Sequence, residues 1–113
     1  MTEKFLAVAQ FYEPFQLGGD LHPIRAFELE GEPIRCAGFD CYLTLFNDRF
    51  RVYEKKTGGL LGDGPSEGSA KQCARRNVKI TPDLKKQMKR MGSAKFHKRI
   101  ATKDVLRRLK NCE

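Results

Sequence analysis

The first half of the chain is patterned as β-strand, and its clearest segment is residues 41–55. Hydrophobic side chains recur at every second position on both sides of Asn47-Asp48. Asn and Asp tolerate the positive φ angles of a two-residue turn. Such a turn pairs Phe46 with Arg49 and brings the hydrophobic positions of the two strands onto one face. The pattern therefore predicts a β-hairpin with this register.

The two faces of the predicted hairpin differ in composition. One is apolar and carries Leu43, Leu45, Phe50 and Val52. The other is aromatic and basic and carries Tyr42, Thr44, Phe46, Arg49, Arg51 and Tyr53. Rings beside arginines are typical of a surface on which bases stack and phosphates bind, so Tyr42, Tyr53, Arg49 and Arg51 are candidate binding residues. The alternative is that a helix or loop covers these rings as part of the core.

Two more strands are expected before the hairpin, and a connection after it. Phe5–Tyr12 is apolar on both alternating faces, and Ile24–Glu30 is a short strand closed by Gly31 and Pro33. Residues 57–70 hold five glycines and read as a flexible Gly-rich loop. This loop lacks the Gly-Lys-Ser/Thr step of a phosphate-binding loop, which argues against a nucleotide site there.

The last third changes to helical spacing. A helix is expected at 82–91, with Thr81 as N-cap and Gly92 as the stop, and with its apolar stripe opposite its cations. A short second helix capped by Ser93 would turn Phe96 and Ile100 inward. A third helix is expected at about 103–110, with Val105 on its buried edge.

The spacing as a whole predicts an α+β fold in one domain, residues 1–113. Residues 1–56 are mainly β, residues 57–70 form the loop, and residues 71–113 are basic and mainly helical. Two or three short helices with narrow apolar stripes are not stable alone, so they must pack on the small antiparallel sheet of the first half.

Charge divides the chain in the same way. The 113 residues carry a net charge of +8, and all 15 basic residues of the second half lie between Lys71 and Lys110, against only Asp83 and Asp104. So many cations on docked helices attract phosphates without reading sequence. The candidate contacts on these helices are Lys85, Lys86, Lys89, Arg90, Lys95, His97, Lys98, Arg99, Lys103, Arg107 and Lys110.

The leading hypothesis is therefore a small, non-catalytic nucleic-acid-binding protein that contacts the phosphate backbone, of DNA or of RNA. One alternative is an inhibitor or adaptor that docks on an acidic surface of a nucleic-acid-processing enzyme. Another is a basic ribonuclease or toxin with His97 or His22 as general base. A helix-turn-helix around Gly92 fits poorly, because Met88 and Lys98 occupy positions where a small and an apolar residue are expected. A membrane-surface role ranks last, because the basic stretch has few apolar residues.

The cysteines and the start of the chain bear on compartment and cofactors. No segment resembles a membrane span or a secretory leader, so a cytoplasmic protein with reduced thiols is expected. Cys36 and Cys41 form only one loose pair, whereas structural zinc sites use two close pairs. We therefore expect neither a metal nor another cofactor, and the sequence supplies no positive sign of an enzyme.

Overall fold

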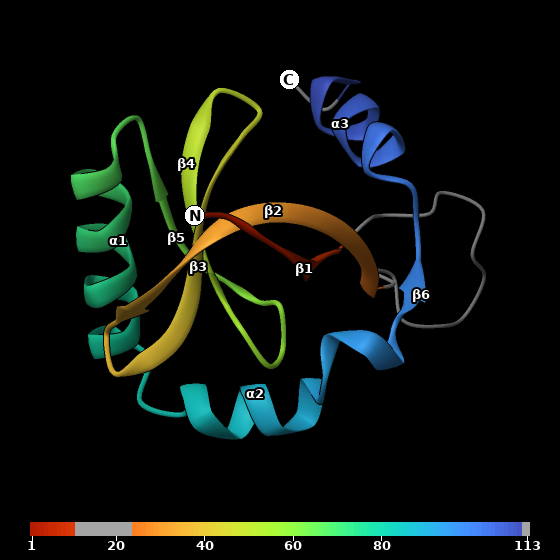
Figure 1. The fold of residues 1–113 in the computed structure, drawn as a ribbon. Coiled ribbons are helices and arrows are strands. Elements are labelled where there is room, and N and C mark those ends of the chain that lie inside the picture. The colour runs from red at the N-terminus through yellow and green to blue at the C-terminus, as the bar shows by residue number, and fades with distance from the viewer. Residues whose placement is uncertain (11–23, 112–113) are drawn as a thin grey trace.

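The computed structural model describes residues 1–10 and 24–111, without the side chains of Gln10, Lys110 and Asn111, and shows an α+β fold (Figure 1). The elements are β1 (Glu3–Gln10), β2 (Ile24–Cys36), β3 (Phe39–Phe46), β4 (Arg49–Glu54), β5 (Leu60–Gly64), α1 (Glu67–Ile80), α2 (Leu84–Met91), the 3-10 turn η1 (Ala94–Phe96), β6 (Lys98–Arg99) and α3 (Thr102–Asn111). The expected order of an antiparallel sheet followed by short helices is confirmed. Residues 11 and 12 of the first expected strand, and His22, lie outside the described residues.

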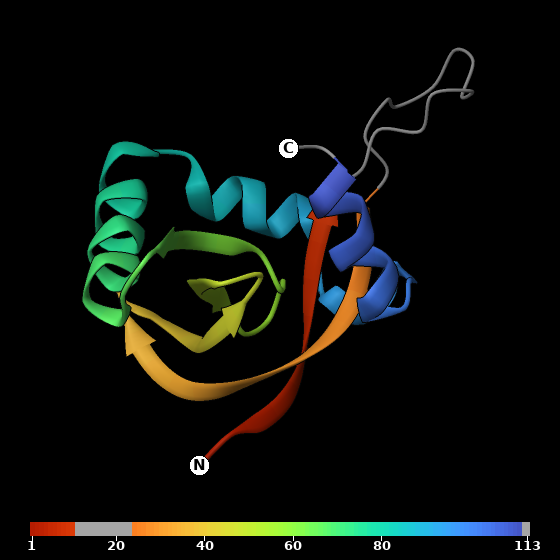
Figure 2. The same ribbon diagram turned by 90° about the horizontal axis from the view of Figure 1, so that it is seen from above.

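The sheet is a curled ribbon with the order β1-β2-β3-β4-β5, in which all these neighbours are antiparallel. β2 is the long strand that joins its two parts, because residues 24–31 pair with β1 and residues 32–36 pair with β3. The curl brings β1 back to the β4–β5 connection, where Val8 N donates to Gly58 O over 2.9 Å. The helices lie around this ribbon, with α1 and α3 at opposite ends of the molecule (Figure 2).

The hairpin has the predicted register. Asn47 and Asp48 have φ values of 54° and 61°, as a tight turn between twisted strands requires. Phe46 lies opposite Arg49, and Tyr42 lies opposite Tyr53.

β2 is longer than predicted, since it continues through Gly31 and Pro33 to Cys36. A Cβ atom on Gly31 would lie 2.9 Å from Leu43 O, so this glycine allows close strand packing where it was expected to end the strand. Pro33 lies beyond the last residue paired with β1, in the part of β2 with one free edge, where a strand tolerates proline.

The prediction of a flexible loop at 57–70 is wrong. The segment contains β5 and the first turn of α1, and its start is fixed by a buried carboxylate. The Thr57 N–H and hydroxyl donate to Glu54 Oε2 over 2.6 and 2.7 Å. At the other end, Ser66 caps α1 and exchanges side-chain hydrogen bonds with Ser69.

Two glycines of this segment serve helix packing. Gly62 and Gly64 lie two residues apart on β5, so they share the face on which α1 packs. A Cβ atom on Gly62 would lie 2.3 Å from Ala74 N, and one on Gly64 would lie 2.9 Å from Ala70 N. Ala70 and Ala74 are both fully buried. Small residues on both elements therefore bring the helix backbone against the strand.

The helices after α1 are partly as predicted. α2 begins two residues later than expected, because Thr81 is the C-cap of α1 rather than an N-cap, and it ends at Gly92. α3 is confirmed, with Val105 fully buried. The second short helix is present only as the 3-10 turn η1, with Ser93 at its N-cap position. Ile100 packs against the core as predicted, but Phe96 is 77 % exposed and Ala94 is the buried residue of the turn.

The chain after η1 forms β6, which adds in parallel to the edge of β2. Ile100 N then donates to Ala26 O over 2.9 Å. After Gly92 the chain forms the short turn η1 and then the edge strand β6. A helix-turn-helix would need its recognition helix at this position, so the structure does not contain one around Gly92.

The cysteines of the described residues are free, and Cys36 and Cys41 are buried beside each other under α1. Burial, with smaller contributions from the neighbouring Cys36 and Glu54, raises the pKa of the Cys41 thiol from 9.0 to about 12. Only the thiolate reacts rapidly with alkylating reagents.

We therefore expect Cys41 to resist iodoacetamide at about pH 8.5 in the native protein and to react on unfolding. Half-buried Cys73 is expected to be modified first, and mass spectrometry of peptides from a Cys112→Ser variant distinguishes the sites. The raised pKa also means that the unfolded chain loses the thiol proton first, so stability falls as the pH rises above about 9. Equal labelling of Cys41 and Cys73 in the native state would contradict this expectation.

Candidate nucleic-acid interface

The cations of α2 form one exposed face. Lys85, Lys86, Lys89 and Arg90 are all exposed. At 100° per residue they lie opposite Leu84, Met88 and Met91, which are half-buried against the sheet. The predicted placement of cations opposite the apolar stripe is therefore what the structure shows.

α1 adds cations that the sequence analysis did not single out. Arg75, Arg76 and Lys79 are exposed on the side of α1 opposite Ala70 and Ala74, and Lys71 is half-buried near the start of the helix. They were missed because the helix itself was missed. The capping box and the alanines four residues apart are the sequence signals that could have found it.

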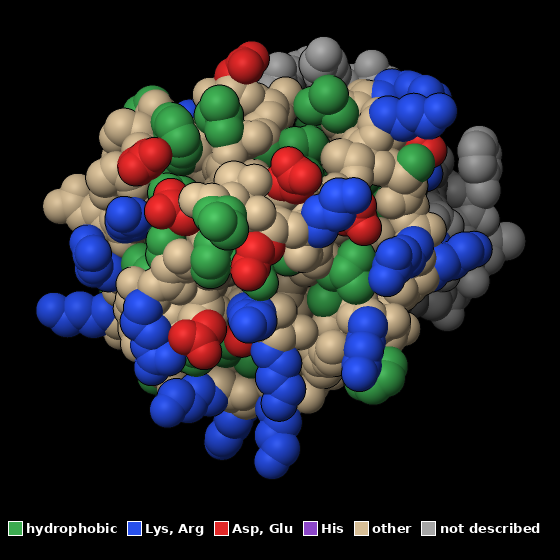
Figure 3. Space-filling view, in the orientation of Figure 1, with side chains coloured by type: hydrophobic (Ala, Val, Ile, Leu, Met, Phe, Trp, Pro, Cys, Tyr) green, Lys and Arg blue, Asp and Glu red, His purple; other side chains and the backbone are tan. Residues whose placement is uncertain are grey.

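α1 and α2 follow each other around a corner at Thr81–Asp83, with Leu84 N donating to Thr81 O over 3.2 Å (Figures 1 and 2). We call their cations the basic helix pair: Lys71, Arg75, Arg76, Lys79, Lys85, Lys86, Lys89 and Arg90. In space-filling view, Lys and Arg side chains gather over α1 at the left and over α2 at the bottom (Figure 3).

The described residues do not neutralise the basic helix pair through ion pairs. The ion pairs within residues 1–10 and 24–111 join other cations to acids: Lys4 to Glu28, Arg35 to Asp40, Arg49 to Asp63 and Arg107 to Asp104. No member of the basic helix pair takes part in an ion pair with any residue of these ranges. The mutual repulsion of these eight cations is relieved by a polyanion, which makes the surface suited to bind one.

A groove of about 780 Å³ runs between the basic side of α1 and the end of the sheet. Arg75, Arg76 and Lys79 line it from the helix, and Arg49 lines it from β4. Its one acid, Asp63, accepts a hydrogen bond from Arg49 Nε over 3.0 Å, so its charge is already matched. The charged residues that line the groove are therefore mainly cations.

The remaining predicted cations lie toward the other end of the molecule. Lys98, Arg99 and Lys103 are exposed along β6 and the start of α3, and Arg107 pairs with Asp104 over 3.3 Å. The side chain of Lys110 is outside the described part of the chain. Since α1 and α3 lie at opposite ends, the structure divides the predicted residues into two groups and does not unite them on one face (Figure 1).

Lys95 and His97 lie between the two groups of cations. Lys95 Nζ is 5.5 Å from the centre of the exposed Phe96 ring. His97 Nε2 donates to Met91 O over 3.1 Å, which leaves Nδ1 as the acceptor in the neutral ring. This contact fixes the histidine against the end of α2.

The aromatic residues of the hairpin are core residues. Tyr42 and Tyr53 are only 5 % and 1 % exposed, and the Tyr42 ring stacks on Phe5 at 4.4 Å. A base could therefore not stack on these two rings. The alternative interpretation, in which the rings are covered as part of the core, is correct for Tyr42 and Tyr53. Arg49 stays exposed at the groove, and Arg51 is half-buried beside Tyr53.

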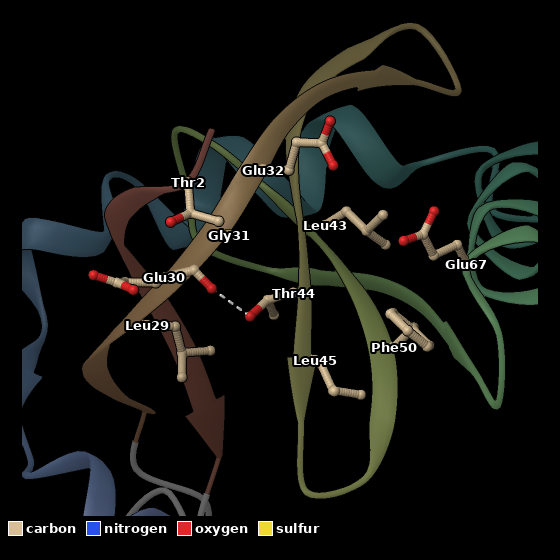
Figure 4. Close-up of a pocket in the computed structure, with 10 residues that line it drawn as sticks. All are labelled: Thr2, Leu29, Glu30, Gly31, Glu32, Leu43, Thr44, Leu45, Phe50 and Glu67. Atoms are coloured by element: carbon tan, nitrogen blue, oxygen red, sulfur yellow. Dashed lines mark hydrogen bonds between the residues drawn. The ribbon is translucent and has the colours of Figure 1, made fainter.

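A hollow between β2, the β3–β4 hairpin and the start of α1 has an acidic lining. This hollow of about 440 Å³ is lined by Glu30, Glu32 and Glu67 around apolar side chains that include the 63 % exposed Leu45 (Figure 4). No Lys or Arg is among the described residues that line it. The lining of this hollow is therefore unfavourable for a phosphate group.

No three His, Cys, Asp or Glu side chains among residues 1–10 and 24–111 are grouped closely enough to hold a metal ion. Among the same residues, no helix has the length and apolar character needed to cross a membrane. No protein-family model, curated protein or solved structure matches this chain.

Proposed function

We propose that this protein is a small, non-catalytic nucleic-acid-binding protein that grips the phosphate backbone with the basic helix pair. The observation that carries the proposal is the set of eight cations on two consecutive helices that lack an ion pair within the described residues. Each phosphate that such a cation neutralises releases counterions from the nucleic acid, which is the main source of sequence-independent affinity.

The character of these side chains favours backbone contact over base reading. The helix pair presents lysines and arginines, and the tyrosines that could have stacked on bases are buried. The exposed amides of these helices, Gln72 and Gln87, are outnumbered by the eight cations, so binding depends mainly on phosphate spacing and charge. We therefore expect several unrelated sequences to bind with similar affinity.

The salt dependence of binding tests this proposal. Fluorescence anisotropy is measured with labelled single- and double-stranded DNA and RNA between about 50 and 200 mM salt. With eight available cations, the slope of log K against log salt for a duplex is expected to lie between about −4 and −7. A slope near zero, or no binding at the lowest salt concentration, would contradict the proposal.

Two controls separate the alternative functions. Polyglutamate as a competitor tests whether any acidic polymer is accepted; if it displaces the nucleic acid at equal charge concentration, an acidic protein surface becomes the favoured partner. Gel analysis of the same RNA after incubation, with and without Mg²⁺, tests for a ribonuclease. Cleavage that depends on His97 would contradict the non-catalytic part of the proposal.

A further inference from the structure

A second cavity, of about 450 Å³, lies between the sheet and the inner side of α2. Its walls include the apolar side chains of Ile24, Leu60 and Met91, and its polar groups are Arg51, Tyr53 and Gln87. The volume falls within the range of about 300–1,000 Å³ that is usual for small-molecule sites. No acid is among the described residues that line it.

Arg51 brings an unmatched positive charge to this cavity. Its Nη1 donates to the Tyr53 hydroxyl over 3.2 Å, and its guanidinium carbon lies 5.4 Å from the centre of the Phe46 ring. Its Nε is buried and has no hydrogen-bond partner among the described residues. Asp63, the residue opposite Arg51 on the neighbouring strand, is paired with Arg49 instead. Residues 1–10 and 24–111 therefore orient this guanidinium without pairing it with an acid.

Tyr53 supplies a second donor at the same place. Its hydroxyl oxygen accepts the bond from Arg51, and no acceptor for its proton is found in the described part of the chain. Burial raises the pKa of Tyr53, although Arg51 opposes the shift. The hydroxyl is therefore protonated at neutral pH and can donate to a bound oxygen.

We propose that this cavity binds a small organic acid, with its carboxylate on Arg51 and Tyr53 and its apolar body against Ile24, Leu60 and Met91. A carboxylate is flat and carries two acceptor oxygens, which matches the parallel N–H groups of a guanidinium. Inorganic phosphate fits less well, because one cation serves it and the remaining walls are apolar. The site lies on the face of α2 opposite its cations, so it is distinct from the nucleic-acid surface.

Titration of the full chain with benzoate tests the proposal, with binding followed by ¹H–¹⁵N NMR. Backbone amide shifts are expected in β4, β5 and α2. Benzyl alcohol, which keeps the ring and lacks the charge, is expected to bind at least about 10-fold more weakly, and inorganic phosphate likewise.

Two substitutions of equal charge locate the site. Arg51→Gln is expected to reduce benzoate affinity at least about 10-fold. Lys55→Gln, just after the end of β4 and exposed, is expected to leave it unchanged. If Arg51→Gln loses its native NMR spectrum, Leu60→Trp, which fills the cavity and keeps Arg51, must reduce binding instead.

Three results would overturn the proposal. They are the absence of benzoate shifts up to about 10 mM, equal benzoate affinity in the parent and the Arg51→Gln variant with a native spectrum, and phosphate binding as tight as benzoate. The first result would exclude organic acids as ligands, and the second would exclude Arg51 as the carboxylate-binding residue. The third would show that the apolar walls do not contribute to binding.

Discussion

Reversing four charges of the basic helix pair, with Arg75, Lys79, Lys86 and Arg90 changed to glutamate, is expected to weaken nucleic-acid binding on the order of 100-fold or more at about 50 mM salt. The change removes up to four phosphate contacts and adds four repulsive charges at the same positions. All four side chains are exposed, so the fold has little reason to respond. Anisotropy titrations of parent and variant on one duplex measure the effect, and the slope against log salt is expected to become shallower by about three to four.

A control variant with the same change in net charge distinguishes direct contact with the nucleic acid from long-range electrostatic attraction. Lys98, Arg99, Lys103 and Arg107, at the other end of the molecule, are changed to glutamate with the same alteration of net charge. We expect less than about 10-fold weakening, because these cations affect binding mainly through the overall field. Equal losses in the two variants would show that the helix pair is not the contact surface.

The second large effect is expected in stability. Gly62→Ala places a Cβ atom 2.3 Å from Ala74 N and 2.7 Å from Ala74 Cα, and both atoms belong to the backbone of α1. Because no side-chain rotation relieves such an overlap, the helix must move off the sheet. We expect a loss of about 3 kcal/mol in the free energy of unfolding, which corresponds to a fall in Tm of roughly 10–20 °C.

Gly68 provides the control for this substitution. It lies in the first turn of α1, and a Cβ atom there would meet nothing within 4 Å. Gly68→Ala is therefore expected to stabilise the protein by about 0.5 kcal/mol, through lower chain entropy in the unfolded state and better helix propensity. Thermal unfolding followed by circular dichroism compares the two variants. A Gly62→Ala protein as stable as its parent would show that α1 does not pack on β5 as described.

Local chemistry made some elements predictable from the sequence. The hairpin at 41–55 could be placed with its register, because the turn residues and the alternation on both strands demand the same pairing. The C-terminal end of α2 and the extent of α3 were close for a similar reason, since Gly92 and the apolar spacing mark them.

Where the sequence analysis failed, the cause was tertiary packing. Glycine at positions 62 and 64 is the usual mark of a flexible segment, yet here it marks contact with a helix, which only the packed structure reveals. Because α1 was not predicted, Arg75, Arg76 and Lys79 were not included among the candidate binding residues. Burial of Tyr42 and Tyr53 followed from β1, whose Phe5 covers both rings, and strand order cannot be read from the hairpin alone.

The two helices of the basic helix pair, α1 and α2, are packed against the sheet to different extents. α1 is fastened to β5 through its buried alanines, whereas α2 has no fully buried side chain. The bend at Thr81–Asp83 therefore joins a rigid arm to one that can shift at small cost. For the proposed function, this difference means that the angle between α1 and α2 can follow polymers of different curvature, at a cost in affinity for ordering α2.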